Sequence, residues 1–471
     1  MLLLTFVDGD GSPGGSSLVN AADLVATRQP LTPTAAGKRI DVLDILRGIA
    51  VCGILPVNIF VMGLAGNTQG RTFPAAWNAD WVAWIVQKLL FEGPMRGLFT
   101  VLFGAGMVLM LRKAEGPDAQ VTPVDVWTRR CLVLLLFGVA HFMLLMWPGE
   151  ILWTYGVAGL ALLAFRTASA RTLWTWALLI IACLSLHRAW DTGTYVTSSM
   201  TALAGEQAVN EGREPTPDQK EAIEAAAETT AANYPAPGSN DEEIAQRTSW
   251  PGVLSWSAAG WSFRHLGVYS WIGVAESLAF MLVGMALMRS GILTGEASAA
   301  TYWRLLLIGA GVGLALRGID FAWQARSGFE IDIHKVVPLM SWLRSGWYQP
   351  ARLALTLGYI GAIVLLVRGA PGVWSEPFRA LGRMALTTYT LQAILTSLLF
   401  YALGYLDAFG AAGLMAVSLA ICVFTAIFCM AWLRDFRMGP AEWLLRALAY
   451  SSFAPWRRDK AADAIGRSPP L

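Results

Sequence analysis

The sequence predicts an all-α polytopic membrane protein of about ten transmembrane helices, with an external loop and a C-terminal interfacial helix. Of its 471 residues, 55% are hydrophobic and only 14% are charged, whereas about a quarter of the residues in a soluble domain are charged. Long apolar runs recur along most of the chain, and a run of ~20 residues is long enough to cross a bilayer. The alternation of polar and apolar residues that a transmembrane β-strand needs is absent.

The apolar runs form two groups of five, and these groups divide the chain. Residues 1–37 are rich in Gly and Ser and are predicted to be a flexible N-terminal tail. The first membrane half is expected over 38–188 and the second over 263–433, with spans near 41–63, 95–111, 130–147, 151–165, 173–188, 267–288, 305–323, 351–367, 384–403 and 412–433. The acidic segment 189–262 is expected to be an external polar loop, and 434–471 a cytoplasmic tail with an interfacial helix.

The positions of Lys and Arg predict the orientation of the chain. With ten spans, five Arg-bearing loops and tails fall on the same side as Lys38 and Arg39; they hold Arg112, Lys113, Arg129, Arg130, Arg166, Arg171, Arg289, Arg304, Arg368, Arg379, Arg383, Arg434 and Arg437. Because cytoplasmic loops carry the excess of basic residues, both termini are expected in the cytoplasm. The loop with Arg326, Lys335 and Arg344 departs from this rule.

Overall charge and cysteine usage exclude several classes of partner. The formal net charge is only +2, so nucleic acid is not an expected partner, whereas membrane lipid is. The five cysteines lie in apolar runs without a CxxC pair. They are predicted to be small buried residues that form neither a disulfide framework nor a metal site.

The first span carries polar residues along one side. Asp44 lies three residues before Arg47, and Asn58 follows eleven residues after Arg47, a spacing that returns to nearly the same face at about 100° per residue. Because charge is costly in lipid, this stripe is expected to face the bundle interior or a wet cavity. Two interpretations stand: a functional site, or an Asp44–Arg47 pair that snorkels to the headgroups.

A second group of polar residues is predicted near the external side of the membrane. His141 lies in the third span, about two turns before Glu150, and Asn58 approaches the same half of the bilayer. A histidine can move a proton at neutral pH, and a carboxylate can fix its tautomer. The alternative is that His141 is a hydrogen-bonded core residue.

Other polar residues also lie within predicted spans: Glu276, Arg317, Asp320 and Gln392. Arg317 and Asp320 are three residues apart and are expected to neutralise each other. Glu276 has no local partner, so it must find one on another helix or remain protonated.

Ordered motifs extend over nearly the whole chain: LDILRGIAVCGILPVN at 43–58, LFGAG at 102–106, His141 followed by Gly149-Glu150-Ile-Leu and Tyr155, GRMALTTY at 382–389 with Gln392, and WLRDFRMGPAEW at 432–443. In these motifs the chain resembles the YeiB-like family of bacterial inner-membrane proteins, whose function is unknown. The resemblance implies a multi-pass protein of the bacterial inner membrane. Two positions depart from the family's pattern, since the family usually has Asp at the position of Glu150 and Asn at that of Thr388.

The YeiB-like family is distantly similar to membrane acyltransferases, including the lysosomal heparan acetyltransferase and bacterial enzymes that O-acylate surface sugars. In the O-acylating enzymes, the residue that matches Asn58 is a His taken as the catalytic base. In the heparan enzyme the catalytic His lies close to a Trp-Asn pair, whereas no His precedes Trp77-Asn78 here. Both positions lack the His, so the resemblance leaves His141 as the predicted base.

The resulting hypothesis is an envelope acyltransferase that moves an acyl group from a donor such as acyl-CoA to an external sugar or lipid. His141 would be the base and Glu150 its orienter, with Arg47 and Arg130 attracting the donor's phosphates. A transporter or exporter of a small polar molecule, using the intramembrane polar residues as a path, is the first alternative. A membrane scaffold without catalytic activity is the second.

Overall fold

The computed structural model describes residues 41–66, 78–112, 122–233, 238, 240–326, 337–370, 372–453 and 455–458. Helices account for nearly all of the ordered backbone in these ranges, which contain no β-strand and a single isolated bridge between Phe436 and Arg457. The all-α prediction is therefore confirmed. The predicted tail at 1–37 and the Trp77 position lie outside the described residues.

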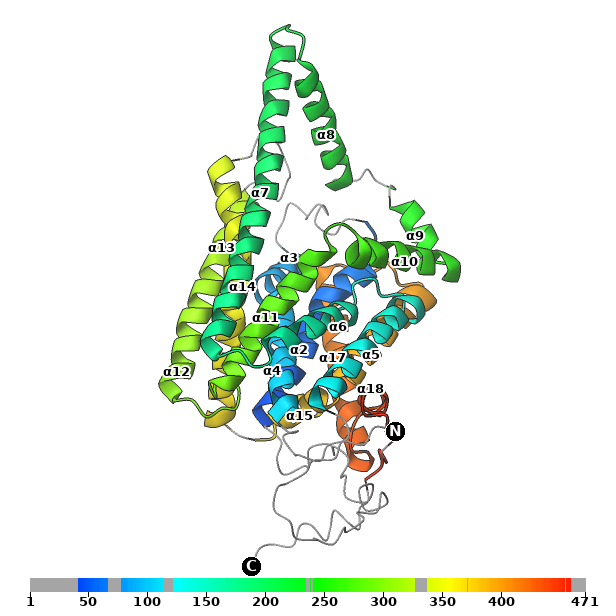
Figure 1. The fold of residues 1–471 in the computed structure, drawn as a ribbon. Helices are drawn as coiled ribbons and strands as arrows, with labels where there is room; N and C mark the ends of the chain where they lie inside the picture. Colours follow the sequence, from blue (N-terminus) through cyan, green and yellow to red (C-terminus); the bar gives the residue numbers. More distant parts are fainter. Residues whose placement is uncertain are drawn as a thin grey trace, which may run out of the picture.

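The first half of the chain forms the first helices of the bundle (Figure 1). They are α2 (Asp41–Gly63), α3 (Ala79–Val86), the π-helix η2 (Gln87–Phe91), α4 (Pro94–Arg112), α5 (Pro123–Leu144), α6 (Leu152–Ala161), the 3₁₀-helix η3 (Leu162–Phe165) and α7 (Ala170–Asn210). Gly93, with a φ of +88°, separates η2 from α4, and α4 begins at the following residue, Pro94.

The second half begins with three helices outside the bundle, α8 (Pro217–Asn233), α9 (Asp241–Arg247) and α10 (Trp250–Leu266). The bundle then continues with α11 (Ser270–Arg289), α12 (Ala299–Arg304), the π-helix η4 (Leu305–Ala310), α13 (Gly311–Arg326), α14 (Pro338–Gly369), α15 (Ser375–Arg383), α16 (Ala385–Ser397), the π-helix η6 (Leu398–Ala402) and α17 (Ala411–Asp435). The last helix, α18 (Pro440–Tyr450), is the predicted interfacial helix.

Within the described ranges, nine helices are long and apolar enough to cross a membrane, one fewer than the expected ten. The tenth expected span, 151–165, is present as a shorter apolar helix, which forms α6 and η3. These two segments have 10 and 4 residues and together extend roughly 20 Å, less than the ~30 Å of a hydrocarbon core. α6 packs against α5 and α11 inside the bundle.

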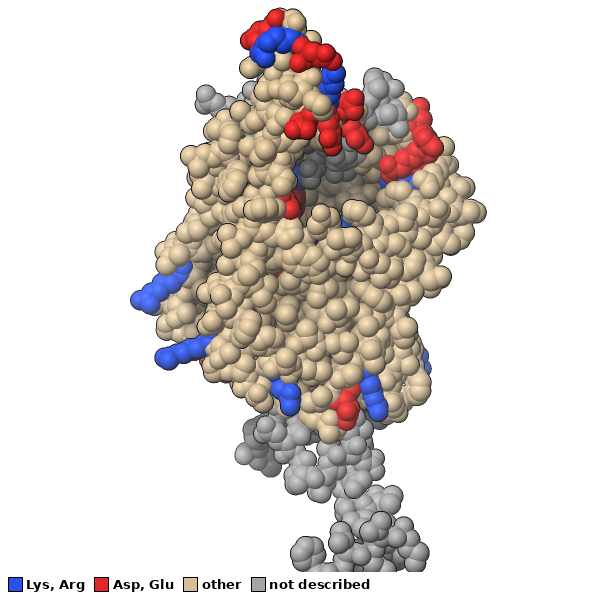
Figure 2. Space-filling view, turned by 45° about the horizontal axis from the view of Figure 1, so that its top comes forward, with Lys and Arg blue, Asp and Glu red and all other residues tan. Residues whose placement is uncertain are grey.

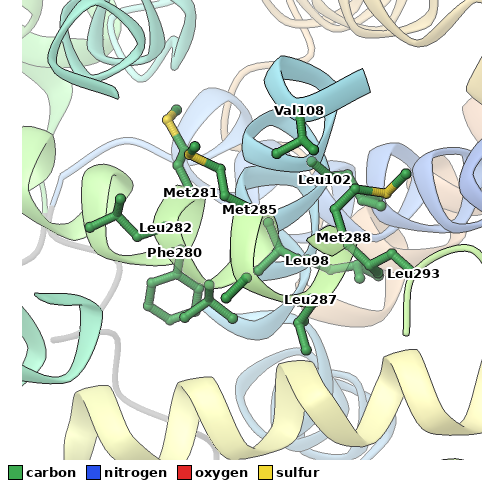
Figure 3. Close-up of a cluster of buried hydrophobic side chains, with 14 of the residues drawn as sticks. Leu98, Leu102, Val108, Phe280, Met281, Leu282, Met285, Leu287, Met288 and Leu293 are labelled. Atoms are coloured by element: carbon green, nitrogen blue, oxygen red, sulfur yellow. The ribbon is translucent and has the colours of Figure 1, made fainter. Parts of the chain in front are cut away.

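The centre of the bundle is the contact between α4 and α11 (Figure 3). Leucine, methionine and phenylalanine side chains from both helices pack there, among them Leu98, Leu102, Phe280 and Met281, all 1% exposed or less. Each helix also contributes a glycine to the contact: a Cβ on Gly104 would overlap the carbonyl of Met281, and a Cβ on Gly284 would overlap that of Val101. Glycine at these positions permits the close approach that membrane helices use for packing.

The segment 189–262, expected to be a loop, is mostly helical. α7 continues to Asn210 and pairs with α8 in a projecting arm (Figure 1), and α9 and α10 return the chain to the bundle. Arg247 anchors this segment: its guanidinium is 1% exposed and donates to the carbonyls of Met62 and Leu64, at the end of α2, at 2.6 and 2.9 Å. Arg247 therefore satisfies carbonyls at the C-terminus of α2 that have no partner within the helix, and in doing so attaches the segment 189–262 to the bundle.

The two ends of the bundle differ in charge. We call the end where α2 begins and α18 lies the basic end, and the end with the α7–α8 arm the arm end (Figure 1). Several arginines at the basic end bond backbone carbonyls close to it: Arg289 donates to the carbonyls of Arg166 and Ala168, and Arg368 to that of Ala297. In Figure 2, acidic side chains gather instead around the arm end.

Candidate functional site

A cavity of about 340 Å³ opens at the basic end and reaches into the bundle between α2, α4, α5, α6, α15, α16 and α18. Its volume is within the range of small-molecule sites in proteins. Apolar side chains from α4 and α5 form much of the wall, and the charged and phenolic groups are Asp44, Arg47, Arg130, Tyr155, Arg383, Tyr389, Glu442, Arg446 and Tyr450. Thus Arg47 and Arg130, predicted to act together, line the same cavity.

The mouth of the cavity is positively charged. Arg47 pairs with Asp44 at 3.1 Å, as predicted from their spacing. Arg130 has no such partner among the described residues: its guanidinium lies 5.8 Å from the centre of the Phe103 ring and 5.9 Å from that of Trp127, and its buried Nε has no hydrogen-bond acceptor. Arg130 lines the cavity, and a guanidinium without a carboxylate partner among the described residues favours an anionic ligand there.

The second carboxylate of the cavity is already engaged by backbone. Glu442 on α18 accepts hydrogen bonds from the N–H groups of Leu386 and Thr387, at 2.6 and 3.1 Å, and from the Thr387 hydroxyl. It therefore caps the first turn of α16, and burial raises the pKa of its carboxyl group. Four arginines and two carboxylates line the cavity, which leaves a net charge of +2.

Two tyrosines mark the deep end of the cavity. The Tyr155 hydroxyl is 2.5 Å from the Thr100 hydroxyl. The Tyr389 hydroxyl accepts a hydrogen bond from the indole N–H of Trp147 at 3.1 Å, and its ring stacks on that of His141 with centroids 5.4 Å apart. Tyr389 therefore separates the cavity from His141.

The surroundings of His141 define its tautomer. Nδ1 lies 2.8 Å from the carbonyl oxygen of Phe137, one turn earlier on α5. A carbonyl can only accept, so Nδ1 carries the proton and Nε2 of the neutral ring has a free lone pair. Nε2 is 3.3 Å from the Thr390 hydroxyl. This arrangement suits a general base, with a backbone carbonyl in the orienting role that we had predicted for Glu150.

Glu150 lies nearby but has other partners. It accepts from the N–H groups of Leu152 and Trp153 at the start of α6, and from the indole of Trp261 on α10, at 2.6, 3.0 and 3.0 Å. Its Oε1 is 3.3 Å from Nε2 of His265. Burial raises the pKa of this carboxyl group, which is only 1% exposed. Glu150 thus joins α6 to α10.

Asn58, the third residue of the predicted catalytic group, is half-buried on α2. It makes no hydrogen bond to another described residue and does not line the basic cavity. Neither His141 nor Glu150 lines this cavity either. The predicted set therefore divides into two groups, with the arginines that were predicted to bind phosphate in the cavity and the predicted base behind Tyr389.

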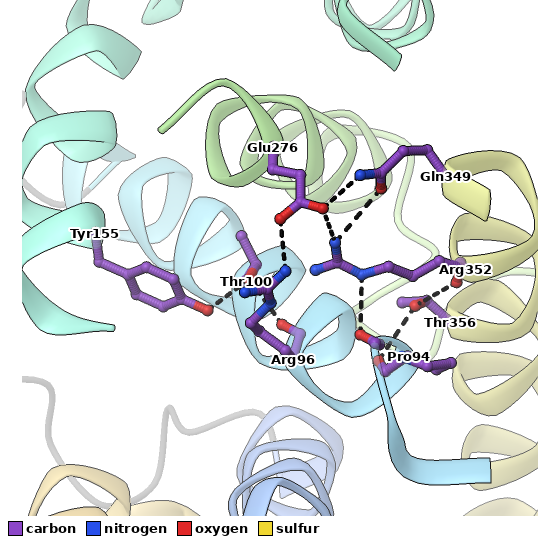
Figure 4. Close-up of polar contacts among 9 residues, drawn as sticks. Pro94, Arg96, Thr100, Tyr155, Glu276, Gln349, Arg352 and Thr356 are labelled. Carbon is purple, nitrogen blue, oxygen red and sulfur yellow. Dashed lines mark hydrogen bonds and ion pairs between the residues drawn. The ribbon is translucent and has the colours of Figure 1, made fainter. Parts of the chain in front are cut away.

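Glu276 finds its partners on other helices, as its sequence position required (Figure 4). Its two oxygens lie 2.5 Å from Arg96 on α4 and 2.5 Å from Arg352 on α14, and Gln349 donates to it as well. Thr100, one turn after Arg96, joins this network to Tyr155. A buried carboxylate between two guanidinium groups is held ionised by their charges.

The predicted Arg317–Asp320 pair is wrong. Arg317 donates to the carbonyls of Lys88 and Leu89 in η2, whereas Asp320 pairs with Arg344 on α14. The π-helical turn leaves carbonyls that a guanidinium can reach, which outweighs the local i,i+3 spacing. Gln392 is buried on α16, and its amide is 4.0 Å from the sulfur of Cys422.

Sequence reasoning missed several residues around the cavity. Tyr155 and Tyr389 stood inside the motifs that carry the family resemblance, which was the available signal for them. Arg446 lies on the helix predicted to be an interfacial anchor, and the helix also closes one wall of the cavity. His265 and Trp261 lie on α10. Trp261 falls in the expected loop 189–262 and His265 just before the predicted span at 267–288, so nothing in the sequence associated them with Glu150.

The fold and the site define a multi-pass α-helical membrane protein with a positively charged internal cavity. The family described as "Protein of unknown function (DUF418)" matches residues 287–452. The chain is 30% identical to the uncharacterized protein YeiB of Escherichia coli (strain K12) over 430 residues, which cover 88% of this chain and 97% of YeiB. It is 29% identical to the uncharacterized protein YxaH of Bacillus subtilis (strain 168) over 436 residues, 90% of this chain and 98% of YxaH. The chain belongs to the YeiB-like family. No solved structure matches it.

Proposed function

We propose that the protein is a cell-envelope acyltransferase, which moves an acyl group from acyl-CoA to a hydroxyl group of an external sugar or lipid. One observation carries the proposal: a cavity with a net charge of +2 leads from the basic end to Tyr389, and Tyr389 stacks on a histidine whose unprotonated Nε2 lies 3.3 Å from the Thr390 hydroxyl. Phosphates are held by arginines through charge-assisted hydrogen bonds, and a long thioester arm needs a deep, largely apolar channel.

In this proposal, residues along the cavity bind the donor, and His141 beyond Tyr389 acts on the acceptor. Arg47 and Arg130 bind the donor's phosphates, and the thioester reaches toward Tyr389. His141 Nε2 takes the proton of the acceptor hydroxyl, whose oxygen attacks the thioester carbonyl carbon. The C–O bond forms, the C–S bond breaks, and the CoA thiolate leaves and takes up the proton held by His141. The ring of Tyr389 must turn aside for the two groups to meet.

Asn58 and Glu150 have supporting roles here. Asn58, which has no hydrogen-bond partner among the described residues, orients the acceptor from α2. Glu150 is a positioning residue, because it fixes the start of α6 and the indole of Trp261. The basic end faces the cytoplasm of a bacterial inner membrane, and both termini are cytoplasmic, which agrees with the excess of arginine at that end.

The experiment is mass spectrometry of envelope lipids and glycans from cells that lack the protein, complemented with wild type, His141→Ala or His187→Ala. His187 is a matched control, since it is another histidine on a long bundle helix, but it pairs with Asp191 on α7 at 3.0 Å. We expect an acylated species that is lost without the protein and restored by wild type and His187→Ala, but not by His141→Ala. An unchanged acyl inventory in the deletion strain would reject acyl transfer.

A transporter or exporter of a small polar molecule is the second candidate. It is favoured by the buried Arg96–Glu276–Arg352 network, which places charges deep in the bundle just beyond the Tyr155 end of the cavity. Altered uptake or efflux of a solute in the deletion strain, with an unchanged acyl inventory, would support this candidate instead.

A further inference from the structure

Arg96 is the exposed member of an otherwise buried network. Its side chain is 41% exposed, whereas the side chains of Glu276 and Arg352 are 10% and 2% exposed. Arg352 bonds Glu276 at 2.5 Å and is itself held by the Gly93 carbonyl. Because Arg352 already neutralises the buried carboxylate, a second arginine is not needed for charge balance. Of the Arg96 donors, only Nη2 bonds another described residue.

Two further arginines act on this network from neighbouring helices. Arg188 on α7 lies over the ring of Tyr348 at 4.3 Å and is within electrostatic reach of Glu276. Arg264 on α10 is exposed and lies within electrostatic reach of Arg96 and Glu150. Each of these arginines comes from a different helix, so their convergence is a property of the fold.

This cluster is separate from the basic cavity. Tyr155 lines the deep end of that cavity, and its hydroxyl bonds Thr100, one turn beyond Arg96. None of the three exposed arginines lines the cavity. Figure 2 shows a hollow with charged side chains at the arm end of the molecule, beneath the projecting arm.

The nearby acids do not cancel this charge. Four arginines, with Arg352 included, face Glu276 and Glu150, and both carboxylates already accept several hydrogen bonds. Glu92 also lies within electrostatic reach of Arg96, and it pairs with Lys88 at 2.7 Å. With Glu92 and Lys88 included, five basic and three acidic groups leave a net charge of +2. Clefts lined by charge of one sign concentrate the opposite ion, and guanidinium groups match the oxygens of phosphate in particular.

We propose that Arg96, with Arg188 and Arg264, forms an anion site at the arm end that binds the phosphate group of the molecule to be acylated. Naming this molecule the acceptor rests on the proposed function, whereas phosphate binding does not. The phosphate belongs either to a lipid headgroup or to a soluble phosphate ester. In both cases the two substrates approach Tyr155 and Tyr389 from opposite ends of the protein.

The test measures the electrostatic potential at the site with a cysteine reporter. Tyr348→Cys is introduced together with Cys183→Ser, since Cys183 is the exposed cysteine in the described part of the chain. In detergent, the rates of modification by anionic sulfonatoethyl and cationic trimethylammonioethyl methanethiosulfonate are compared with the rates for free 2-mercaptoethanol. The same protein without the reporter gives the background. Inorganic phosphate is then added, with chloride at equal ionic strength as its control.

We expect the anionic reagent to be favoured about 10-fold relative to the free thiol, and phosphate to slow its reaction more than chloride does. Arg96→Gln should abolish both effects. Arg96→Lys, which keeps the charge, and Arg171→Gln, which removes a charge from the exposed basic end, should preserve the charge preference. Gel filtration reports whether each variant is folded. A ratio equal to that of the free thiol, or one that Arg96→Gln leaves unchanged, would overturn the proposal.

The source of the phosphate is resolved in lipid nanodiscs. Slower modification in phosphatidylglycerol discs than in phosphatidylcholine discs, without added phosphate, assigns the site to a lipid headgroup. Slowing by added phosphate alone assigns it to a soluble ester. A phosphate effect that persists in a protein with no influence on the acyl inventory would refute acyl transfer but not the anion site. If the acylated species depend on the protein but phosphate has no effect on the modification rate, the anion site would be refuted and acyl transfer would not.

Discussion

Replacing Glu276 with glutamine should be the most damaging single charge removal in the bundle. The side chain keeps its shape but leaves Arg352, 2% exposed, without a carboxylate at 2.5 Å. Removal of one partner from a buried ion pair costs about 3–5 kcal/mol, because the remaining charge stays buried. Asp44→Asn is the matched control: its partner Arg47 is 28% exposed, so its loss should cost at most about 1 kcal/mol.

The assay is reversible unfolding of the purified protein in mixed micelles, by titration with a denaturing detergent. A double variant provides a second test. Glu276→Gln combined with Arg352→Met removes both buried charges and should recover a substantial part of the lost free energy of unfolding. Equal free energies of unfolding for Glu276→Gln and Asp44→Asn would refute this account of the network, as would an additive loss in the double variant.

Three other changes probe the contacts around the site. Arg247→Ala should free the end of α2 and speed hydrogen exchange across 241–266, with no change in α17 as the internal control. Glu442→Ala removes the cap of α16 and should lower the free energy of unfolding by about 1–3 kcal/mol, measured as above. For His265, burial and the charge of Arg264 lower the pKa to about 4. The unfolded chain then binds more protons than the folded one below an ordinary histidine pKa of ~6.5, so stability should fall as the pH drops from ~6.5 toward 4. His265→Gln should flatten this dependence, and an identical pH profile in the variant would contradict it.

Local spacing predicted contacts best where both partners lie on one helix and face protein. The Asp44–Arg47 pair was foreseen from its i,i+3 spacing and is present. The same reasoning failed for Arg317 and Asp320, because their helix faces other elements that offer better partners. For Glu276 the need for a partner was predictable from the cost of burying a charge, but Arg96 and Arg352 are 180 and 76 residues away and could not be named.

The membrane class was predictable because hydrophobicity is summed over long windows, and nine apolar helices confirm it. The tenth span, at 151–165, is present as a shorter apolar helix. The cavity itself depends on seven helices that meet in space, and α18 was interpreted from its amphipathic pattern as an anchor alone. The position of His141 within an apolar span directed attention to it, and its Tyr389 neighbour came from the fold.

The central claim is that the basic cavity holds the phosphates of an acyl-CoA donor. Calorimetric titration of the purified full-length protein with CoA tests it directly, with Arg130→Gln and Arg171→Gln as the paired variants. We predict saturable binding that Arg130→Gln weakens at least about 10-fold, equivalent to ~1.4 kcal/mol, while Arg171→Gln leaves it unchanged. Absence of CoA binding in the wild type, or equal affinity in Arg130→Gln, would contradict the claim.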